Sequence, residues 1–155
     1  MVFPGNWEKY VETIYDAFSA DFLGVRPNFL GKPLNLKRHP EEKGRVATFW
    51  HFISEGKVES ERTPNFKRCE RIRWPRAFIE NYRDPSIKAW RTVRAKPKGK
   101  ETRIILLMES ENYVVILADR GSFILPWTAY YLDRSHTMEK LLREFDGAKK
   151  AGDAF

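Results

Sequence analysis

The sequence predicts one α+β domain, built on an antiparallel sheet of four or five strands with an N-terminal and a C-terminal helix packed on it. The first observation is a set of three apolar runs of strand length between Glu101 and Leu132, parted only by residues 110–112 and 119–121. Short connections of this kind join antiparallel neighbours in a meander. The second is apolar spacing of helical period near both ends. The third is size, because 155 residues with 42% hydrophobic content suit one core, and no linker divides residues 1–155.

The N-terminal helix is predicted over residues 6–20. Asn6 can cap its first turn, and the apolar positions after it repeat at helical spacing. They are Trp7, Tyr10, Val11, Ile14, Tyr15 and Phe18. Because the opposite side is charged, this stripe is expected to face the core. Residues 21–44 hold several glycines and prolines, which predicts an extended connection, and they carry a small basic group that includes His39.

Two further segments alternate in a way that predicts strands. In Arg45–Ser54, His51 shares one face with apolar residues, which is typical of a half-buried strand. In Lys67–Arg76, alternation places arginines on one side, which predicts a short strand with a cationic face. Pro75 can end that strand and begin a short helix. Ser86–Arg94 fits either a short helix or an edge strand.

The last run of the meander places two hydroxyl groups near each other. Regular alternation puts Thr128 and Tyr130 on one face of the strand, roughly 7 Å apart along it. The sheet core is therefore expected over residues 45–132. Beyond it, apolar residues at helical spacing predict a C-terminal helix over residues 135–147 that packs back on the sheet. The residues after this helix are expected to fray.

Positive charge is concentrated in the middle third of the chain. Residues 62–103 hold fourteen Lys or Arg against four acids, a local net charge of +10 in a protein whose net charge is +7. A cationic surface of this density is the expected footprint of a polyanion, so RNA is the predicted partner. A solvated face that binds nothing is the alternative that charge alone leaves open.

Several classes of function are excluded by what the sequence lacks. A single cysteine, Cys69, permits no internal disulfide and no thiolate cluster, which is typical of a reducing cytoplasm. No apolar stretch of about 18 residues and no export signal occur, so no membrane partner is expected. The three histidines lack metal-ligand spacing, and phosphate-loop and serine-elbow motifs are missing. We therefore expect neither a metal nor a cofactor.

One metal-free reaction suits the residues that remain. Cleavage of RNA by its own 2′-hydroxyl needs a base for that proton, cations to stabilise the phosphorane, and an acid for the leaving 5′-oxygen. The acid and base are sought among His39, His51 and Tyr130, and Thr128 is a candidate donor to the phosphate. The cations and further RNA contacts are sought among arginines, whose forks match phosphate oxygens. They are Arg68, Arg71, Arg73, Arg76 and Arg91.

The order of these segments resembles a known superfamily. An N-terminal helix, a basic His-bearing segment, RVATFWHFISEG, CERIRWPR and a meander ending in WTAY make residues 37–131 similar to phage- and plasmid-associated members of the Barnase/EndoU/colicin/RelE-like (BECR) nucleases. The Thr-Ala-Tyr at 128–130 is the most specific part of the resemblance. The matching positions are Thr128 and Tyr130 on the last strand, Arg71 and Arg73 on the basic second strand, and His39 or His51 near the first strand.

The resemblance implies a toxin-like, metal-independent endoribonuclease that leaves a cyclic phosphate. It also implies an acidic antitoxin or immunity protein over residues 62–103, because such an enzyme must be restrained in its own cell. Pro126 interrupts the final strand and departs from the pattern of the superfamily. Two other functions stay open: a non-catalytic nucleic-acid-binding module of phage or plasmid origin, and a protein-binding domain with an acidic partner. The first would bind RNA with steep salt dependence but release no product, and the second would do neither.

Overall fold

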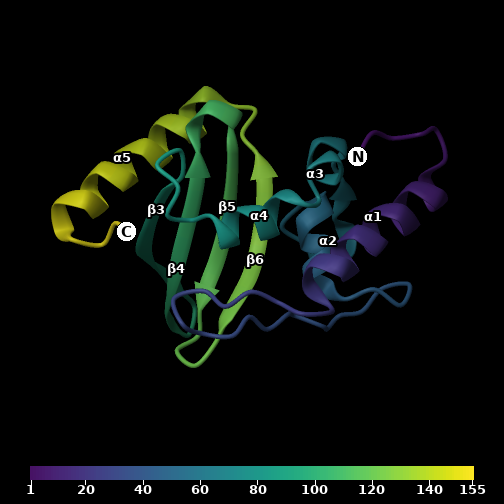
Figure 1. Cartoon of the computed structure of the whole chain (residues 1–155), viewed down its shortest axis with the longest axis horizontal. Helices are drawn as coiled ribbons and strands as arrows, with labels where there is room; N and C mark the ends of the chain where they lie inside the picture. The colour runs from purple at the N-terminus through teal and green to yellow at the C-terminus, as the bar shows by residue number, and fades with distance from the viewer.

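The computed structural model describes all 155 residues and confirms the α+β class. A four-stranded antiparallel sheet stands at the centre, with one long helix on one side and a group of helices beyond its other edge (Figure 1). The helices are α1 (Trp7–Phe22), α2 (Ala47–Ile53), α3 (Phe66–Glu70), α4 (Trp74–Glu80) and α5 (Ser135–Ala151). The strands of the sheet are β3 (Lys88–Lys96), β4 (Gly99–Met108), β5 (Tyr113–Asp119) and β6 (Ile124–Tyr131). The smaller elements are the 3-10 helices η1 (Glu59–Glu61) and η2 (Glu109–Glu111) and a ribbon of β1 (Ser54–Glu55) with β2 (Thr63–Pro64).

The meander predicted from the apolar runs is confirmed. Strand order is β3-β4-β5-β6, and every neighbouring pair is antiparallel. The segment that fitted either a helix or an edge strand is the edge strand β3. Asn112, with a φ of 51°, closes the connection between β4 and β5 in the left-handed conformation, which Asn tolerates better than most residues. The sheet itself spans residues 88–131, so residues 45–87 of the expected sheet core lie outside it.

The predicted N-terminal helix is confirmed as α1, which continues slightly beyond its predicted end. The Asn6 side chain accepts a hydrogen bond from the Lys9 backbone at 3.1 Å, so it caps the helix as expected. After α1, residues 23–44 form the extended connection, which contains isolated β-bridges and no helix; the first two residues of the predicted connection, 21 and 22, belong to α1. One of these bridges joins Leu34 to Ile124 at the start of β6, and it ties the connection to the sheet.

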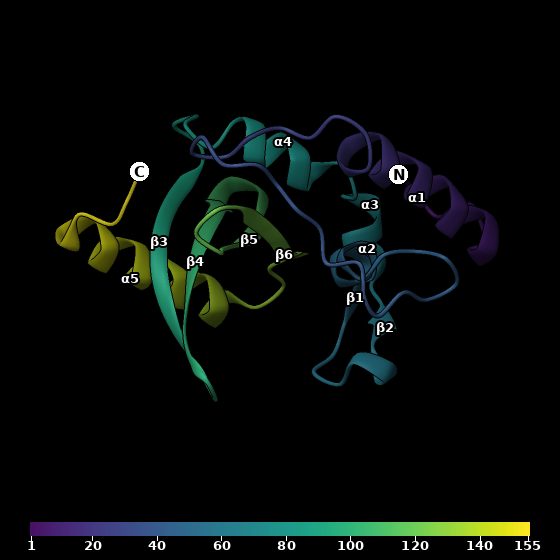
Figure 2. The ribbon, with the colours of Figure 1, turned by 90° about the horizontal axis from the view of Figure 1, so that it is seen from below.

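The sheet divides the interior into two hydrophobic cores of unequal size. The larger contains 25 buried residues and lies between one face of the sheet and α1, α2, α4 and the extended connection. The smaller contains 7 buried residues and lies between the other face and α5. Figure 2 shows α4 and the connection on one side of the strands and α5 on the other. None of the helices has both the length and the apolar character to cross a membrane.

The strand predicted over Arg45–Ser54 is wrong, because most of this segment forms the helix α2. All of the residues of α2 except Trp50 are buried. A helix that is buried on nearly every side has no polar face, so its sequence shows no helical period. Its aromatic and β-branched residues meanwhile favour a strand. α2 packs against β6, the edge strand of the sheet.

The strand predicted over Lys67–Arg76 is also wrong. This segment forms α3 and the start of α4. Asn65 caps α3 by accepting a hydrogen bond from the Arg68 backbone at 3.1 Å, a start signal that the alternating pattern concealed. Pro75 lies in the first turn of α4, which confirms the predicted short helix. The predicted cationic strand face does not form, and its arginines point in different directions.

A β-bulge in β6 changes the predicted alternation. The register leaves Trp127 as the extra residue, because its two neighbours pair with consecutive residues of β5. As a result Ile124 and Ala129 both face the larger core, although strict alternation would place them on opposite faces. Thr128 and Tyr130 lie beyond the bulge and keep the shared face predicted for them.

The C-terminal tail pairs with the sheet where fraying was expected. α5 continues beyond its predicted end, and Gly152, with a φ of 81°, ends it in the left-handed conformation. The carbonyl of Asp153 then accepts a hydrogen bond from the Arg91 backbone at 2.9 Å, and the Phe155 N–H donates to Ala89 at 2.8 Å. The tail therefore covers part of the outer edge of β3.

Candidate functional site

The sheet face that carries α5 is apolar at one end and basic at the other. Trp90, Ile105 and Leu107 form the apolar end in the smaller core. Because side chains alternate along a strand, residues nearer the turn between β3 and β4 project from the same face. We call this second part, with its neighbours at the edge of the sheet, the basic face. Its residues are Arg94, Lys96, Glu101, Arg103 and Trp127, with Lys37 of the connection beside them. Thr128 and Tyr130 lie farther along β6, in line with Ile105 and Leu107, where Arg68 of α3 meets the edge of the sheet.

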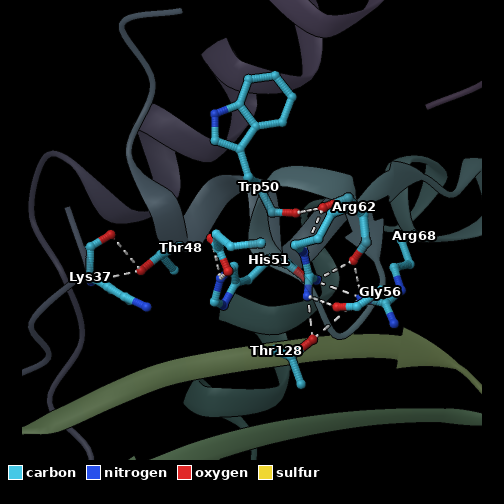
Figure 3. A network of polar contacts seen from close by, with 10 residues as sticks. Lys37, Thr48, Trp50, His51, Gly56, Arg62, Arg68 and Thr128 are labelled. Carbon is cyan, nitrogen blue, oxygen red and sulfur yellow. Dashed lines mark hydrogen bonds and ion pairs between the residues drawn. The ribbon is translucent and has the colours of Figure 1, made fainter. Parts of the chain in front are cut away.

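Arg68 is a firmly positioned cation at the edge of the sheet. Its Nη1 donates to the carbonyl oxygens of His51 at 3.1 Å and Ser54 at 2.5 Å, and it lies 3.4 Å from Thr128 Oγ1 (Figure 3). These carbonyls belong to the C-terminal end of α2, where free acceptors favour a cation. No carboxylate lies within ion-pair distance of Arg68. Its Nε and Nη2 make no hydrogen bond, so they are free to bind an anion.

A second guanidinium shares an acceptor with Arg68. Arg62 donates from Nη2 to the Ser54 carbonyl at 2.5 Å, from Nη1 to Gly56 O at 2.8 Å, and from Nε to Ser54 Oγ at 3.1 Å. All three of its nitrogens are thus used to close the ribbon between β1 and β2. Burial lowers the pKa of Arg68, and the charge of Arg62 lowers it further. Because neither guanidinium has a carboxylate partner, a bound anion would stabilise both.

The two hydroxyl residues of β6 both lie beside Arg68. The Thr128 hydroxyl donates to the His51 carbonyl at 3.2 Å, and the Arg68 guanidinium lies 5.2 Å from the centre of the Tyr130 ring. Burial raises the pKa of Tyr130, although the charges of Arg68 and Arg94 oppose this shift. The phenol is therefore protonated at neutral pH and can donate a proton or a hydrogen bond.

A cavity of about 320 Å³ opens beside Arg68 and Tyr130. Arg134, at the start of α5, also lines it and has no carboxylate within ion-pair distance. The remaining lining residues are Glu55, Asn65, Tyr131, Leu132, Asp133 and Thr137. The cavity therefore brings two arginines, two carboxylates and a protonated phenol to one hollow, and the anion-binding group that it offers is the guanidinium of Arg68, which has no carboxylate partner.

His51 is paired with a residue that sequence reasoning did not select. Its Nε2 lies 2.9 Å and 3.1 Å from the two carboxylate oxygens of Glu59 in η1. Burial lowers the pKa of His51 more than the hydrogen bond to Glu59 raises it, so the imidazole is neutral at pH 7. The pKa of Glu59 is also lowered, because hydrogen bonding to His51 and the charges of Lys37 and Arg62 outweigh its desolvation.

The pairing fixes which nitrogen of His51 carries the proton. An ionised Glu59 can only accept, so Nε2 of the neutral ring must hold the hydrogen. Nδ1 then carries the lone pair, and no hydrogen bond within the protein engages it. His51 is therefore a neutral base with one oriented, unoccupied acceptor.

An NMR titration of the three histidines tests this assignment. We expect His51 to titrate below its ordinary value of 6.5 and to show the Nε2–H tautomer in ¹⁵N spectra. In Glu59→Gln the His51 pKa is expected to fall further, because the hydrogen bond and charge that favour the imidazolium are lost. The His51 signals are assigned from their absence in His51→Gln. A His51 pKa that rises in Glu59→Gln would contradict the pairing.

Two cations lie near the ring of Trp127, the bulged residue of β6. The Lys37 ammonium and the Arg103 guanidinium each lie 5.4 Å from the centre of its ring, and the His51 ring meets it edge to face at 5.3 Å. The indole is half-buried. An aromatic surface with two cations near it suits a nucleobase together with its backbone phosphates.

Glu101 holds Lys96 and Arg103 of the basic face in place, together with the neighbouring Arg120. Its side chain is 3% exposed and is ion-paired with Arg103 at 2.7 Å, with Arg120 at 3.0 Å and with Lys96. Desolvation would raise its pKa, but hydrogen bonds from Lys96 and Arg103 lower it overall. One buried carboxylate thus positions three cations, and the cluster keeps a net positive charge.

Five of the predicted site residues lie away from this corner. His39 is exposed on the connection. Arg71 lies over the rings of Trp74 and Tyr131, at 5.1 Å and 4.9 Å, beside the larger core. The other three are held in ion pairs: Arg73 with Asp21, Arg76 with Glu80 and Arg91 with Asp119. Arg71, Arg73 and Arg76 diverge because Lys67–Arg76 forms two helices, which direct successive side chains around an axis rather than to one face.

The structure adds residues that sequence reasoning missed. Glu59 and Arg62 lie in a polar loop without a motif, and only the folded ribbon brings them to α2. Lys37 and Arg103 are separated in sequence, and both reach Trp127 through the fold. Trp127 lies in the WTAY segment, and its position next to Thr128 was the one signal in the sequence that could have identified it as a site residue.

Arg68 and Tyr130 line one cavity, whereas the His51 imidazole is 6% exposed and is not among the residues that line it. A fixed cation, a protonated phenol and a neutral imidazole are groups suited to binding a phosphodiester and moving protons. Among all 155 residues, no group of three or more His, Cys, Asp or Glu is arranged to hold a metal ion. The chain matches no protein-family model, no curated protein and no solved structure.

Proposed function

We propose that this protein is a metal-independent, toxin-like endoribonuclease that cleaves RNA by attack of the 2′-hydroxyl. The observation that carries the proposal is the placement of Arg68. This guanidinium has no carboxylate partner, is held by the carbonyls of α2, and lies between Thr128 and Tyr130 beside a cavity of about 320 Å³. A cation fixed in this way stabilises charge that develops on a phosphorane without reorganising during the reaction.

In the proposed reaction each proton that is transferred has a named donor and a named acceptor. His51 takes the proton of the 2′-hydroxyl, and the 2′-oxygen attacks the phosphorus. The bond from phosphorus to the 5′-oxygen breaks, and Tyr130 gives its proton to that oxygen. The products are a 2′,3′-cyclic phosphate and a free 5′-hydroxyl. Arg68 donates hydrogen bonds to the phosphate oxygens throughout, and the Thr128 hydroxyl turns from the His51 carbonyl to donate a further one.

The basic face provides a path for the RNA strand. Trp127 is proposed to stack one base, with Lys37 and Arg103 on the neighbouring phosphates. Stacking of this kind contributes about 1 to 3 kcal/mol per base. The cations held by Glu101 extend the same surface toward the turn between β3 and β4.

The proposal includes a partner and a compartment. An acidic antitoxin or immunity protein is placed on residues 62–103, because their charge attracts an acidic surface as well as RNA. Action in a reducing cytoplasm is supported by Cys69, the single cysteine, which is buried. Burial raises the pKa of its thiol to about 12, so it offers no reactive thiolate.

Incubation with RNA in EDTA tests the function directly. The expected result is cleavage with 2′,3′-cyclic phosphate ends. Binding that weakens steeply with salt but leaves the RNA intact would instead indicate a non-catalytic nucleic-acid-binding module. Neither binding nor cleavage would indicate a protein-binding domain.

Removing the Tyr130 hydroxyl tests the proposed acid. Tyr130→Phe is expected to slow cleavage by about 10², because the leaving 5′-oxygen loses its proton donor, while RNA affinity stays nearly constant. Tyr82→Phe is the matched control, since Tyr82 lies against Phe29 on the opposite side of the sheet. Rates are measured on one labelled RNA. Equal rates for both variants would remove Tyr130 from the mechanism.

A further inference from the structure

The outer edge of β3 is covered over only part of its length. The tail residues Asp153–Phe155 pair with it along residues 89–91. The backbone groups of Ala89 and Arg91 that bond to the tail point away from β4. Because the N–H and C=O groups of successive residues point to opposite sides of a strand, those of every second residue after Arg91 also point outward. Val93 and Ala95 come next, and neither the tail nor any other element engages their outward N–H and C=O groups. Val93 is 58% exposed, so this stretch of the edge is open.

The strand and its turn carry only positive side chains. Residues 88–100 contain six Lys or Arg and no acid. Arg91, Arg94 and Lys96 are ion-paired with carboxylates of other segments, and Lys88, Lys98 and Lys100 have no carboxylate within ion-pair distance. An exposed strand edge is a template for another strand, and cationic side chains discourage pairing with a second, equally cationic copy. The same cations favour a strand that carries carboxylates, because specificity follows from attraction to one partner and repulsion of another.

We propose that the edge of β3 at Val93–Lys96 is a docking site for an acidic protein segment in extended conformation, which adds a strand to the sheet beside the tail. Main-chain hydrogen bonds to Val93 and Ala95 supply affinity in this mode, and acidic side chains meet the surrounding cations. The inference rests on the proposed function, since it names where the inhibitory partner binds. Docking at this edge leaves the remainder of the partner to cover the basic face.

Hydrogen exchange followed by NMR tests the geometry on the full chain. In the free protein, the amides of Val93 and Ala95 are expected to exchange about 10²-fold faster than those of Thr92 and Arg94, which bond to β4. The probe is a ten-residue peptide that alternates Glu with Val. It is expected to slow exchange at Val93 and Ala95 at least about 10-fold. The same peptide with Lys in place of Glu is the control and is expected to have no effect.

A proline variant separates strand addition from charge attraction alone. Ala95→Pro removes an outward N–H from an exposed edge position, where proline is tolerated, and keeps every cation. Ala95→Pro is expected to lower the affinity for the acidic peptide at least about 10-fold, whereas Ala95→Thr is expected to keep the parental affinity. Thermal unfolding checks that both variants are folded.

Three results would overturn the inference. They are slow exchange at Val93 and Ala95 in the free protein, peptide binding without added protection there, and equal peptide affinity of the two Ala95 variants. Protection of the same amides by an RNA oligonucleotide instead of the peptide would assign the edge to RNA. None of these measurements depends on RNA cleavage, so the docking site and the proposed ribonuclease can fail separately.

Discussion

Replacing His51 with alanine is expected to lower the rate of RNA cleavage by about 10² to 10⁴, because the reaction loses its general base. RNA affinity should change little, since the cations of the basic face remain. Single-turnover cleavage and equilibrium binding measure the two effects separately. His136→Ala, on the exposed start of α5, is the matched control. A variant that loses binding and cleavage to the same degree would assign His51 a structural role.

The pH dependence gives His51 a second test. Because burial lowers the pKa of His51 from its ordinary value of 6.5, the imidazole is still neutral at pH values just below 6.5. Cleavage by the parent protein should therefore persist below pH 6.5 and be lost only when the pH falls to the lowered pKa. The free energy of unfolding depends on the same pKa. The unfolded chain takes up the proton first, so the free energy of unfolding falls as pH drops below 6.5 toward the folded pKa. His51→Gln should lack this part of the pH dependence.

Replacing Arg68 with alanine is expected to abolish cleavage and to lower the free energy of unfolding by about 3 kcal/mol. The stability loss follows because the His51 and Ser54 carbonyls and the Thr128 hydroxyl lose a charged donor at once. Cleavage is lost because no other cation occupies that position beside Thr128 and Tyr130. Chemical denaturation and the RNA assay in EDTA measure the two effects.

Arg68→Lys separates the two roles of the arginine. A lysine keeps the charge but cannot hold two carbonyls while presenting further donors to a phosphate. It should recover part of the stability and remain at least about 10-fold slower than the parent. Arg83→Ala, an exposed arginine on the far side of the sheet, should leave both quantities near parental values. A fully active Arg68→Lys would show that a point charge is sufficient at this position.

The parts of the fold that depend on local pattern were predictable from the sequence. Asn6 caps α1 as its position indicates, and the three apolar runs form neighbouring strands because short connections leave them no other arrangement. α2 was not predictable by the same reasoning. Its helical state follows from burial by α1, the connection and β6, and a single sequence does not contain those neighbours.

The candidate site was predictable to a smaller degree. Arg68, Thr128 and Tyr130 meet at one corner, as the combination of charge and the WTAY segment indicated. Arg71 and Arg73 do not join them, because the predicted strand is a pair of helices. Glu59 reaches His51 only through the turn that η1 makes, and a lone glutamate in a polar loop gives no signal of such a contact.

The unequal cores give the protein two regions of different resistance to opening. α5 is held by a cluster of 7 buried residues, whereas the opposite side of the sheet is held by 25. Local opening is expected to begin where the fewest apolar contacts must be given up. Detachment of α5 would release the tail from β3 and separate Glu144 from Arg94 without disturbing α2 or Arg68. Because Arg134 and Thr137 at the start of α5 line the cavity beside Arg68, and Tyr130 packs against the smaller core, such an opening would widen that cavity while Arg68 stays bonded to the carbonyls of His51 and Ser54.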